Sequence, residues 1–170
     1  MCKRQLCPAL VVILVIGLGN RGRGGNRRNF SDADGPACHV QTGLINDDRV
    51  DLGDFMRAEK PDMILCTGGM SVDPDDNTPG GVRASGARIV TYGAPVLPGA
   101  MFLLGYFEDG MPVMGLPGCV MYAGATIFDL MLPYVAADVP VTRADVAALG
   151  EGGLCLGCPE CHFPICPFGK

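Results

Sequence analysis

A glycine-rich and acidic segment, residues 67–79 (TGGMSVDPDDNTP), has features that suit the binding of an anion. Gly68 and Gly69 follow an apolar run, and adjacent glycines allow a sharp turn that brings backbone N–H groups close to a ligand. Thr78 and Pro79 form a typical helix start, whose unpaired N–H groups favour negative charge. The segment therefore predicts an anion-binding loop.

Three carboxylates and a hydroxyl group lie in the same segment. Asp73, Asp75 and Asp76 could bind a bridging Mg²⁺, take part in proton transfer or recognise amino groups of a heterocycle. Ser71 adds a hydroxyl donor. The alternative is a solvated acidic turn in which Asp75 or Asp76 caps the next helix, and the chemistry of the loop alone does not separate the two.

Four cysteines lie close together near the end of the chain: Cys155, Cys158, Cys161 and Cys166. Short spacings allow four thiolates to converge on one tetrahedral Zn²⁺. The spacing also resembles that of an iron–sulfur protein, with a last gap one residue longer. His162 is a candidate substitute ligand. We expect a zinc ion or an iron–sulfur cluster here rather than free thiols or disulfides.

A second glycine pattern, Gly17–Gly22 (GLGNRG), matches the GxGxxG signature of dinucleotide-binding proteins and follows an apolar run. The signature should open a helix, but the following residues 23–29 (RGGNRRN) are poor helix formers. No strand ending in an acidic residue appears about twenty residues later. A nicotinamide or flavin enzyme is therefore the weaker alternative.

Apolar runs and turn residues predict the elements that position these groups. We expect strands over residues 9–16, 63–66, 88–92 and 112–115, helices over 47–59, 79–85 and 121–135, and a short helical segment over 98–104. Alternating strands and helices favour an α/β fold, a three-layer α/β/α sandwich with a mostly parallel sheet. The β-branched run 9–16 is predicted to be a central parallel strand.

The 170 residues suit one domain with an appendage. We divide the chain into an irregular N-terminal region over residues 1–44 with a poorly matching loop 17–36, a core domain 45–150 and a cysteine-rich metal-binding tail 151–170. A net charge of −5 provides no basic field for nucleic acid, and the first apolar run is short for a membrane span. We therefore expect the protein to bind neither nucleic acid nor a membrane. The clustered cysteines favour a location in the reducing cytoplasm.

Segment 67–79 resembles the signature of the molybdopterin-binding (MoaB/Mog-like) domain family. In that family a strand ends in a Gly-Gly loop and an Asp-x-Thr-Pro opens the next helix, as Asp76, Thr78 and Pro79 do here. Asp47 or Asp48 resembles the acidic residue before the preceding helix. Residues 115–122 (GLPGCVMY) and 126–133 are similar to the family's second ligand loop and final helix, and residues 92–99 to the segment between the loops.

The resemblance implies molybdopterin, a pterin dithiolene phosphate, as the ligand. Asp76 and Asp47 would be the catalytic residues, with Mg²⁺ and ATP as further cofactors. The residues expected to bind the cofactor are Thr67, Gly68, Gly69, Ser71, Asp73, Asp75 and Thr78 in the first loop, and Leu116, Pro117 and Gly118 in the second.

The resemblance leaves the activity open. Some members adenylylate molybdopterin, whereas others insert molybdate, and Met70-Ser71 is closer to the insertion-type members. The chain would be a molybdopterin adenylyltransferase, an insertion-type transferase, or a non-catalytic cofactor-delivery or metal-sensing module. A molybdoenzyme or another cofactor-biosynthesis protein is the expected partner, and a homo-oligomer, a trimer by resemblance, the expected assembly.

Overall fold

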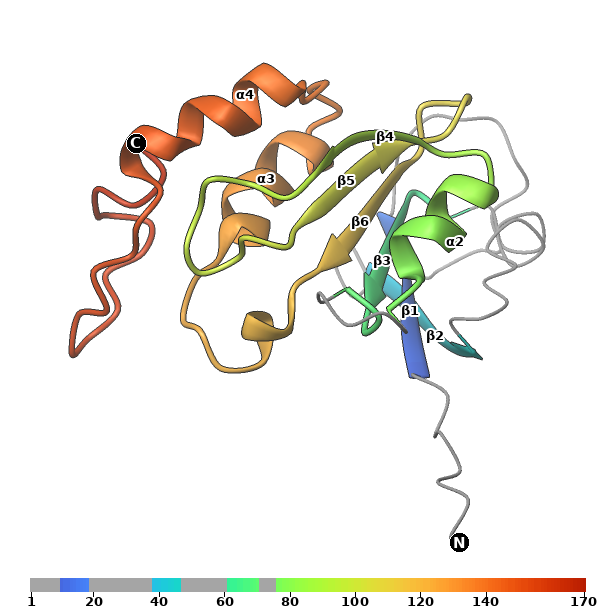
Figure 1. Cartoon of the computed structure of the whole chain (residues 1–170), viewed down its shortest axis with the longest axis horizontal. Coiled ribbons are helices and arrows are strands. Elements are labelled where there is room, and N and C mark those ends of the chain that lie inside the picture. Colours follow the sequence, from blue (N-terminus) through green and yellow to red (C-terminus); the bar gives the residue numbers. More distant parts are fainter. Residues whose placement is uncertain (1–9, 19–37, 47–60, 71–75) are drawn as a thin grey trace, which may run out of the picture.

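The computed structural model describes residues 10–18, 38–46, 61–70 and 76–170, the first two ranges as backbone only. The strands are β1 (Leu10–Leu18), β2 (Cys38–Asn46), β3 (Met63–Thr67), β4 (Arg88–Tyr92), β5 (Leu103–Tyr106) and β6 (Pro112–Leu116). The helices are α2 (Thr78–Ala84), α3 (Ile127–Ala136) and α4 (Arg143–Ala148), with short 3₁₀ helices at Gly118–Met121 and Leu149–Gly152 (Figure 1).

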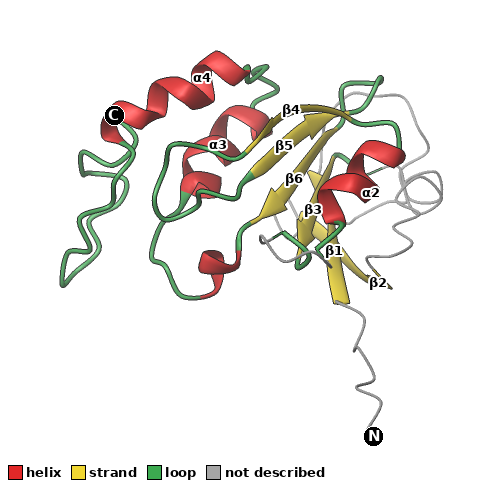
Figure 2. Cartoon of the chain, in the orientation of Figure 1, coloured by secondary structure: helices red, strands yellow, loops and turns green. Residues whose placement is uncertain are grey.

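The strands form one mixed sheet of six in the order β2-β1-β3-β6-β5-β4 (Figure 2). Only β3 and β6 pair in parallel among the described strands, and the other neighbours are antiparallel. The predicted mostly parallel sheet is therefore wrong, although the α/β class is confirmed. The physical reason is that β4, β5 and β6 follow one another without the crossover helices that parallel neighbours require.

The two faces of the sheet carry different core clusters. Met63 and Leu65 of β3 pack with Met131 of α3 and Val146 of α4. Ile64 and Cys66, on the opposite face, pack in a second cluster that contains Val82 of α2. Helices therefore cover both faces, as expected for a strand whose side chains alternate between two buried sides. The three-layer prediction also included a helix at 47–59, which lies outside the described residues.

Most local predictions are confirmed, and the errors have simple causes. Strands occur as predicted at 63–66, 88–92 and 112–115, and a helix at 79–85. The first strand, however, is antiparallel to both its neighbours rather than central and parallel. The predicted helical segment 98–104 is wrong at its end, because residues 103–106 form strand β5. This short apolar run is buried between the two core clusters on opposite faces of the sheet.

Two further differences concern the ends of elements. The predicted helix 121–135 begins only at Ile127, because the Thr126 side chain caps the helix and accepts a hydrogen bond from the N–H of Phe128 (3.2 Å). Strand β2 and helix α4 were not predicted. Among the described residues, no helix is long and apolar enough to cross a membrane.

The last residues fold back onto the domain. Leu97 and Leu154 form a parallel β-bridge, in which the Leu97 N–H donates to Gly153 O (2.6 Å) and the Cys155 N–H donates to Leu97 O (2.8 Å). Phe168 is only 3 % exposed and belongs to the core cluster with α3. The C-terminus lies beside the end of α4 (Figure 1).

Candidate functional site

The two predicted ligand loops begin at the carboxyl ends of neighbouring parallel strands. Thr67, the last residue of β3, pairs with Leu116, the last residue of β6. The loop that starts at Gly68 therefore begins beside the loop that starts at Pro117. Open α/β sheets bind ligands at this position, outside the carboxyl ends of their parallel strands. The sequence predicted each loop separately, and the tertiary structure places them side by side.

The first loop is held by hydrogen bonds from the start of α2. Gly68 and Gly69 have φ angles of +88° and +56°, in the left-handed region that favours glycine. The Thr78 N–H donates to Gly69 O (3.2 Å), and Thr78 Oγ1 donates to Gly68 O (3.0 Å). Because Thr78 is fully buried, its hydroxyl group stabilises the loop from the core side and is not exposed to a ligand.

Met70 continues this loop into the core. Its side chain is buried and packs over Gly115 of β6. A methyl group added at Gly115 would lie 2.7 Å from Met70 Sδ and 3.0 Å from the Leu103 side chain. Glycine at position 115 thus provides the space that Met70 occupies, so the first loop packs directly on the strand that leads into the second loop.

A cavity of about 550 Å³ lies beside the second loop, and Met70 lines it from the first loop. Such a volume is typical of sites for small molecules. A methyl group added at the exposed Gly118 would meet no described atom within 4 Å, so its backbone is open to a ligand. The lining comprises Met70, Leu97, Pro98, Gly99, Ala100, Met101, Pro117, Gly118, Cys119, Tyr122, Leu154 and Cys155.

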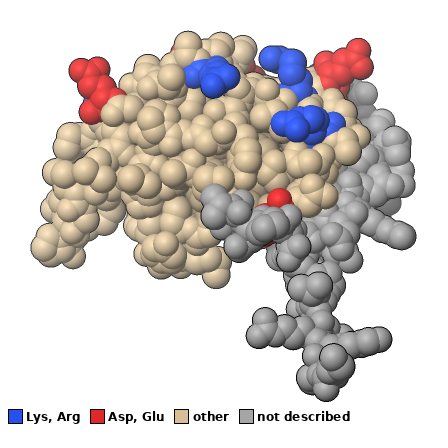
Figure 3. Space-filling model, in the orientation of Figure 1, with Lys and Arg blue, Asp and Glu red and all other residues tan. Residues whose placement is uncertain are grey.

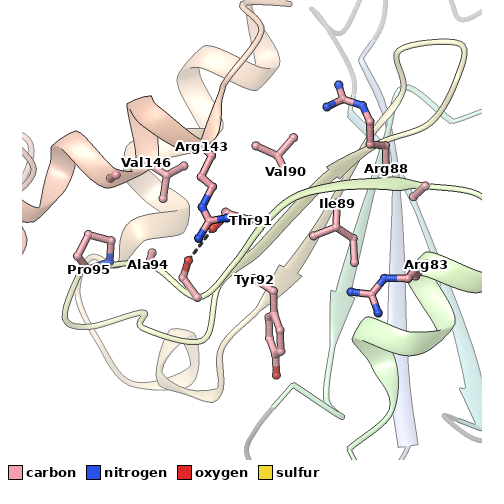
Figure 4. Close-up of a pocket in the computed structure, with 13 residues that line it drawn as sticks. Arg83, Arg88, Ile89, Val90, Thr91, Tyr92, Ala94, Pro95, Arg143 and Val146 are labelled. Atoms are coloured by element: carbon pink, nitrogen blue, oxygen red, sulfur yellow. Dashed lines mark hydrogen bonds between the residues drawn. The ribbon is translucent and has the colours of Figure 1, made fainter.

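Asp76 lies near the end of β4. Burial raises the pKa of the Tyr92 hydroxyl group, and the negative charge of Asp76 raises this pKa further. The two residues therefore lie close enough for their charges to interact, although Tyr92 is 41 % exposed. Figure 4 shows the Tyr92 ring directed away from Arg143. Tyr92 belongs to the matched segment 92–99, but its proximity to Asp76 has no signal in the sequence.

A second cavity, of about 660 Å³, lies along the edge strand β4. Arg83, Arg88 and Arg143 contribute to its lining, and basic side chains gather on the upper part of the face in Figure 3. Thr91 Oγ1 donates its hydrogen bond to Gly93 O (2.7 Å), so this donor is already used within the protein. The cavity is larger, but no described residue of the two ligand loops lines it; Tyr92, which interacts with Asp76, lies at its lining.

The other predicted residues fall into two groups. Leu116 and Pro117 are buried, so their side chains support the second loop while Gly118 is exposed. Thr67 is half-buried at the end of β3. The remaining predicted site residues lie outside the described residues: Asp47, Ser71, Asp73 and Asp75.

The dinucleotide alternative lacks its structural context. Gly17 lies within β1, where it pairs with His39 of the antiparallel β2. A dinucleotide signature instead follows a parallel strand and opens a helix. The rest of the pattern, residues 19–22, lies outside the described residues.

The four tail cysteines surround a third cavity, of about 130 Å³, together with His162. Cys155 and Cys166 are half-buried, Cys158 and Cys161 are exposed, and all four are free thiols. Within the portion of the chain that the structure describes, no three His, Cys, Asp or Glu side chains are grouped closely enough to hold a metal ion as they stand. The metal site therefore stays a prediction.

Comparison with known proteins identifies the family. The model of a family described as a probable molybdopterin-binding domain matches residues 35–137, which is more than half of the 170-residue chain. The match begins earlier than the predicted resemblance, before β2, and includes both ligand loops and α3. No curated protein and no solved structure matches the chain. The chain belongs to the family of probable molybdopterin-binding domains.

Proposed function

We propose that this protein binds molybdopterin, or its adenylylated or molybdenum-containing form, in the cavity lined by Met70 and residues 117–119, beside the glycines of the first loop. The pairing of Thr67 with Leu116 carries the proposal, because it brings the family's two ligand loops to one edge of the sheet. Family membership supports a role related to molybdopterin in cofactor biosynthesis. The cavity of about 550 Å³ supports a small-molecule ligand.

Different regions of the cavity suit different portions of the ligand. Met70, Leu97 and Met101 provide apolar surface for the pterin ring. The backbone N–H groups of the glycine loops would bind the phosphate, since glycine allows close approach. By resemblance, Thr67, Ser71, Asp73 and Asp75 complete this loop, and Thr78 keeps it in shape through its bond to Gly68 O.

Asp76 and Asp47 are the proposed catalytic residues. In an adenylyltransferase, a phosphate oxygen of molybdopterin would attack the α-phosphorus of ATP, breaking its bond to the β-phosphate and releasing pyrophosphate. Such a transfer needs positioning and charge neutralisation more than a strong base, and carboxylates that hold Mg²⁺ supply both. An insertion-type transferase would use the same pocket for the adenylylated ligand.

A non-catalytic delivery or metal-sensing module is the second candidate. The observation in its favour concerns position 70, where adenylylating members have a threonine by resemblance. Here the position is occupied by the buried Met70, whose thioether packs on Gly115. ATP turnover that depends on added molybdopterin would support the enzyme, and binding without turnover would support the module. The family resemblance also suggests a homo-oligomer, a trimer, that serves a molybdoenzyme or another cofactor-biosynthesis protein, and the clustered cysteines favour a cytoplasmic location.

The test of the site compares two carboxylate deletions by calorimetry with molybdopterin. Asp76→Ala should abolish measurable binding in the presence of Mg²⁺, because it removes a carboxylate that would hold the ion against the ligand phosphate. Glu108→Ala removes the same charge from an exposed position between β5 and β6, at the other end of β6, and should bind as the wild type does. Equal binding by both variants would contradict the assignment of Asp76.

A further inference from the structure

The four cysteines of the tail line one cavity, although no three metal-ligand side chains of the described residues are close enough to hold a metal ion as they stand. The cysteines come from one irregular stretch, residues 155–166, and the cavity has a volume of about 130 Å³. Tetrahedral thiolate sites use four such side chains from short loops. Because the four residues lie in no helix or strand, their side chains can turn inwards without breaking a regular element.

The backbone around the cysteines is anchored at both ends. Gly153 lies so close to Pro95 O that no larger residue fits there, and the adjoining β-bridge fixes the main chain at Cys155. At the far end, the Gly169 N–H donates to Gly152 O (2.7 Å). The buried Phe168 packs edge-to-face with Phe163, with 6.4 Å between the centroids of the two rings. The domain thus fixes both ends of the cysteine segment before any metal binds.

The cysteine cavity borders the candidate ligand site. Cys155 and Leu154 line both cavities. Cys161 Sγ would lie 3.2 Å from a methyl group at Gly124, in the segment that links the second ligand loop to α3. The thiols therefore pack against the elements that form the ligand cavity.

We propose that Cys155, Cys158, Cys161 and Cys166 bind one metal centre through their thiolates, a zinc ion or an iron–sulfur cluster, at the border of the ligand cavity. The site lies beyond the residues that the family match covers, so it adds to the proposed function. On binding, each thiol gives its proton to solvent and its sulfur forms a bond to the metal, without oxidation of the protein.

Metal content, acid-labile sulfide and the visible spectrum of the full chain, purified without oxygen, test the proposal. About one zinc per chain without colour identifies the zinc form, and iron with sulfide and a broad visible absorption identifies the cluster. Both results support the site. Four thiols that react freely, with no metal bound even after incubation with Zn²⁺ or with Fe²⁺ and sulfide, would overturn it, as would disulfides among them.

Matched cysteine variants locate the centre. Cys158→Ser and Cys161→Ser change exposed residues and should lose most of the bound metal while circular dichroism stays unchanged. Cys119→Ser changes a thiol of the ligand cavity and should keep the metal content of the wild type. Full metal content in the tail variants would refute the assignment. These measurements use no molybdopterin. A negative result for the metal centre therefore does not contradict the proposed binding of molybdopterin, and a negative result for molybdopterin binding does not contradict the metal centre.

Discussion

At the scale of single residues, burial decides which thiols can react. Cys66 is fully buried in β3, and burial raises the pKa of its thiol to about 12. Burial also raises the pKa of Cys119, partly offset by a backbone hydrogen bond. Cys158 and Cys161, by contrast, are exposed. Because the thiolate is both the metal ligand and the nucleophile, Cys66 is inert in the native state.

The pKa of Cys66 predicts a loss of stability at high pH. Its ordinary pKa of 9.0 applies to the unfolded chain, whereas the native value is about 12. Below pH ~9 the thiol is neutral in both states; above it, only the unfolded chain ionises, so the free energy of unfolding falls by about 1.4 kcal/mol per pH unit until the pH reaches the native pKa.

Urea unfolding of the wild type and Cys66→Ala at about pH 8 and pH 10 measures this effect. The variant removes the titrating group, so the stability difference between the two proteins should shrink at the higher pH by about 1.4 kcal/mol. The other ionisable groups are common to both proteins and cancel. An unchanged difference would show that Cys66 titrates equally in the folded and unfolded chains.

At the scale of elements, β3, the first loop and α2 act as one unit. Thr78 belongs to the helix, yet both of its hydrogen bonds to the loop go to glycine carbonyl groups. Two glycines in the left-handed region lose much conformational freedom on folding, and these bonds help to offset that cost. The shape of the ligand loop therefore depends on the first residue of the next helix.

Thr78→Val should weaken both the fold and ligand binding. Valine keeps the size of the side chain but leaves Gly68 O without its donor, at a cost of about 1 kcal/mol in the free energy of unfolding. Thr78→Ser retains the hydroxyl group and should stay closer to the wild type in its affinity for molybdopterin. Denaturant unfolding and calorimetry on both variants check this, and a valine variant with wild-type affinity would contradict it.

At the scale of the whole molecule, the C-terminal residues complete the core of the domain. Phe168 packs in the same cluster as Met131 and Val135 of α3. Gly169 approaches the Leu130 side chain so closely that a methyl group there would lie 2.5 Å from one of its carbons. The end of the chain therefore contributes buried apolar surface, in addition to carrying the cysteines.

Two substitutions in the tail test whether its buried side chain stabilises the domain more than an exposed one does. Phe168→Ala should lower the free energy of unfolding by about 3–5 kcal/mol, because the aromatic ring is 3 % exposed and leaves a cavity. Ile165→Ala removes a side chain that is 87 % exposed and should change stability by less than about 0.5 kcal/mol. Similar unfolding midpoints for the two variants would show that the tail does not pack on the core.

The sequence alone determined the local features and the family. The Gly-Gly turn, the Thr-Pro helix start and the apolar strands at 63–66, 88–92 and 112–115 depend on neighbouring residues, so patterns of a few residues predict them. The family resemblance added the second ligand loop, and the match over residues 35–137 confirms the family.

Only the tertiary structure decided strand direction and the surroundings of the site. An apolar run pairs equally well in either direction, so the antiparallel β1 depends on β3, a partner distant in sequence. The contact of Leu97 with Leu154, which brings Cys155 to the ligand cavity, has no local pattern. Such a contact arises from the burial of the whole core, to which widely separated segments contribute together.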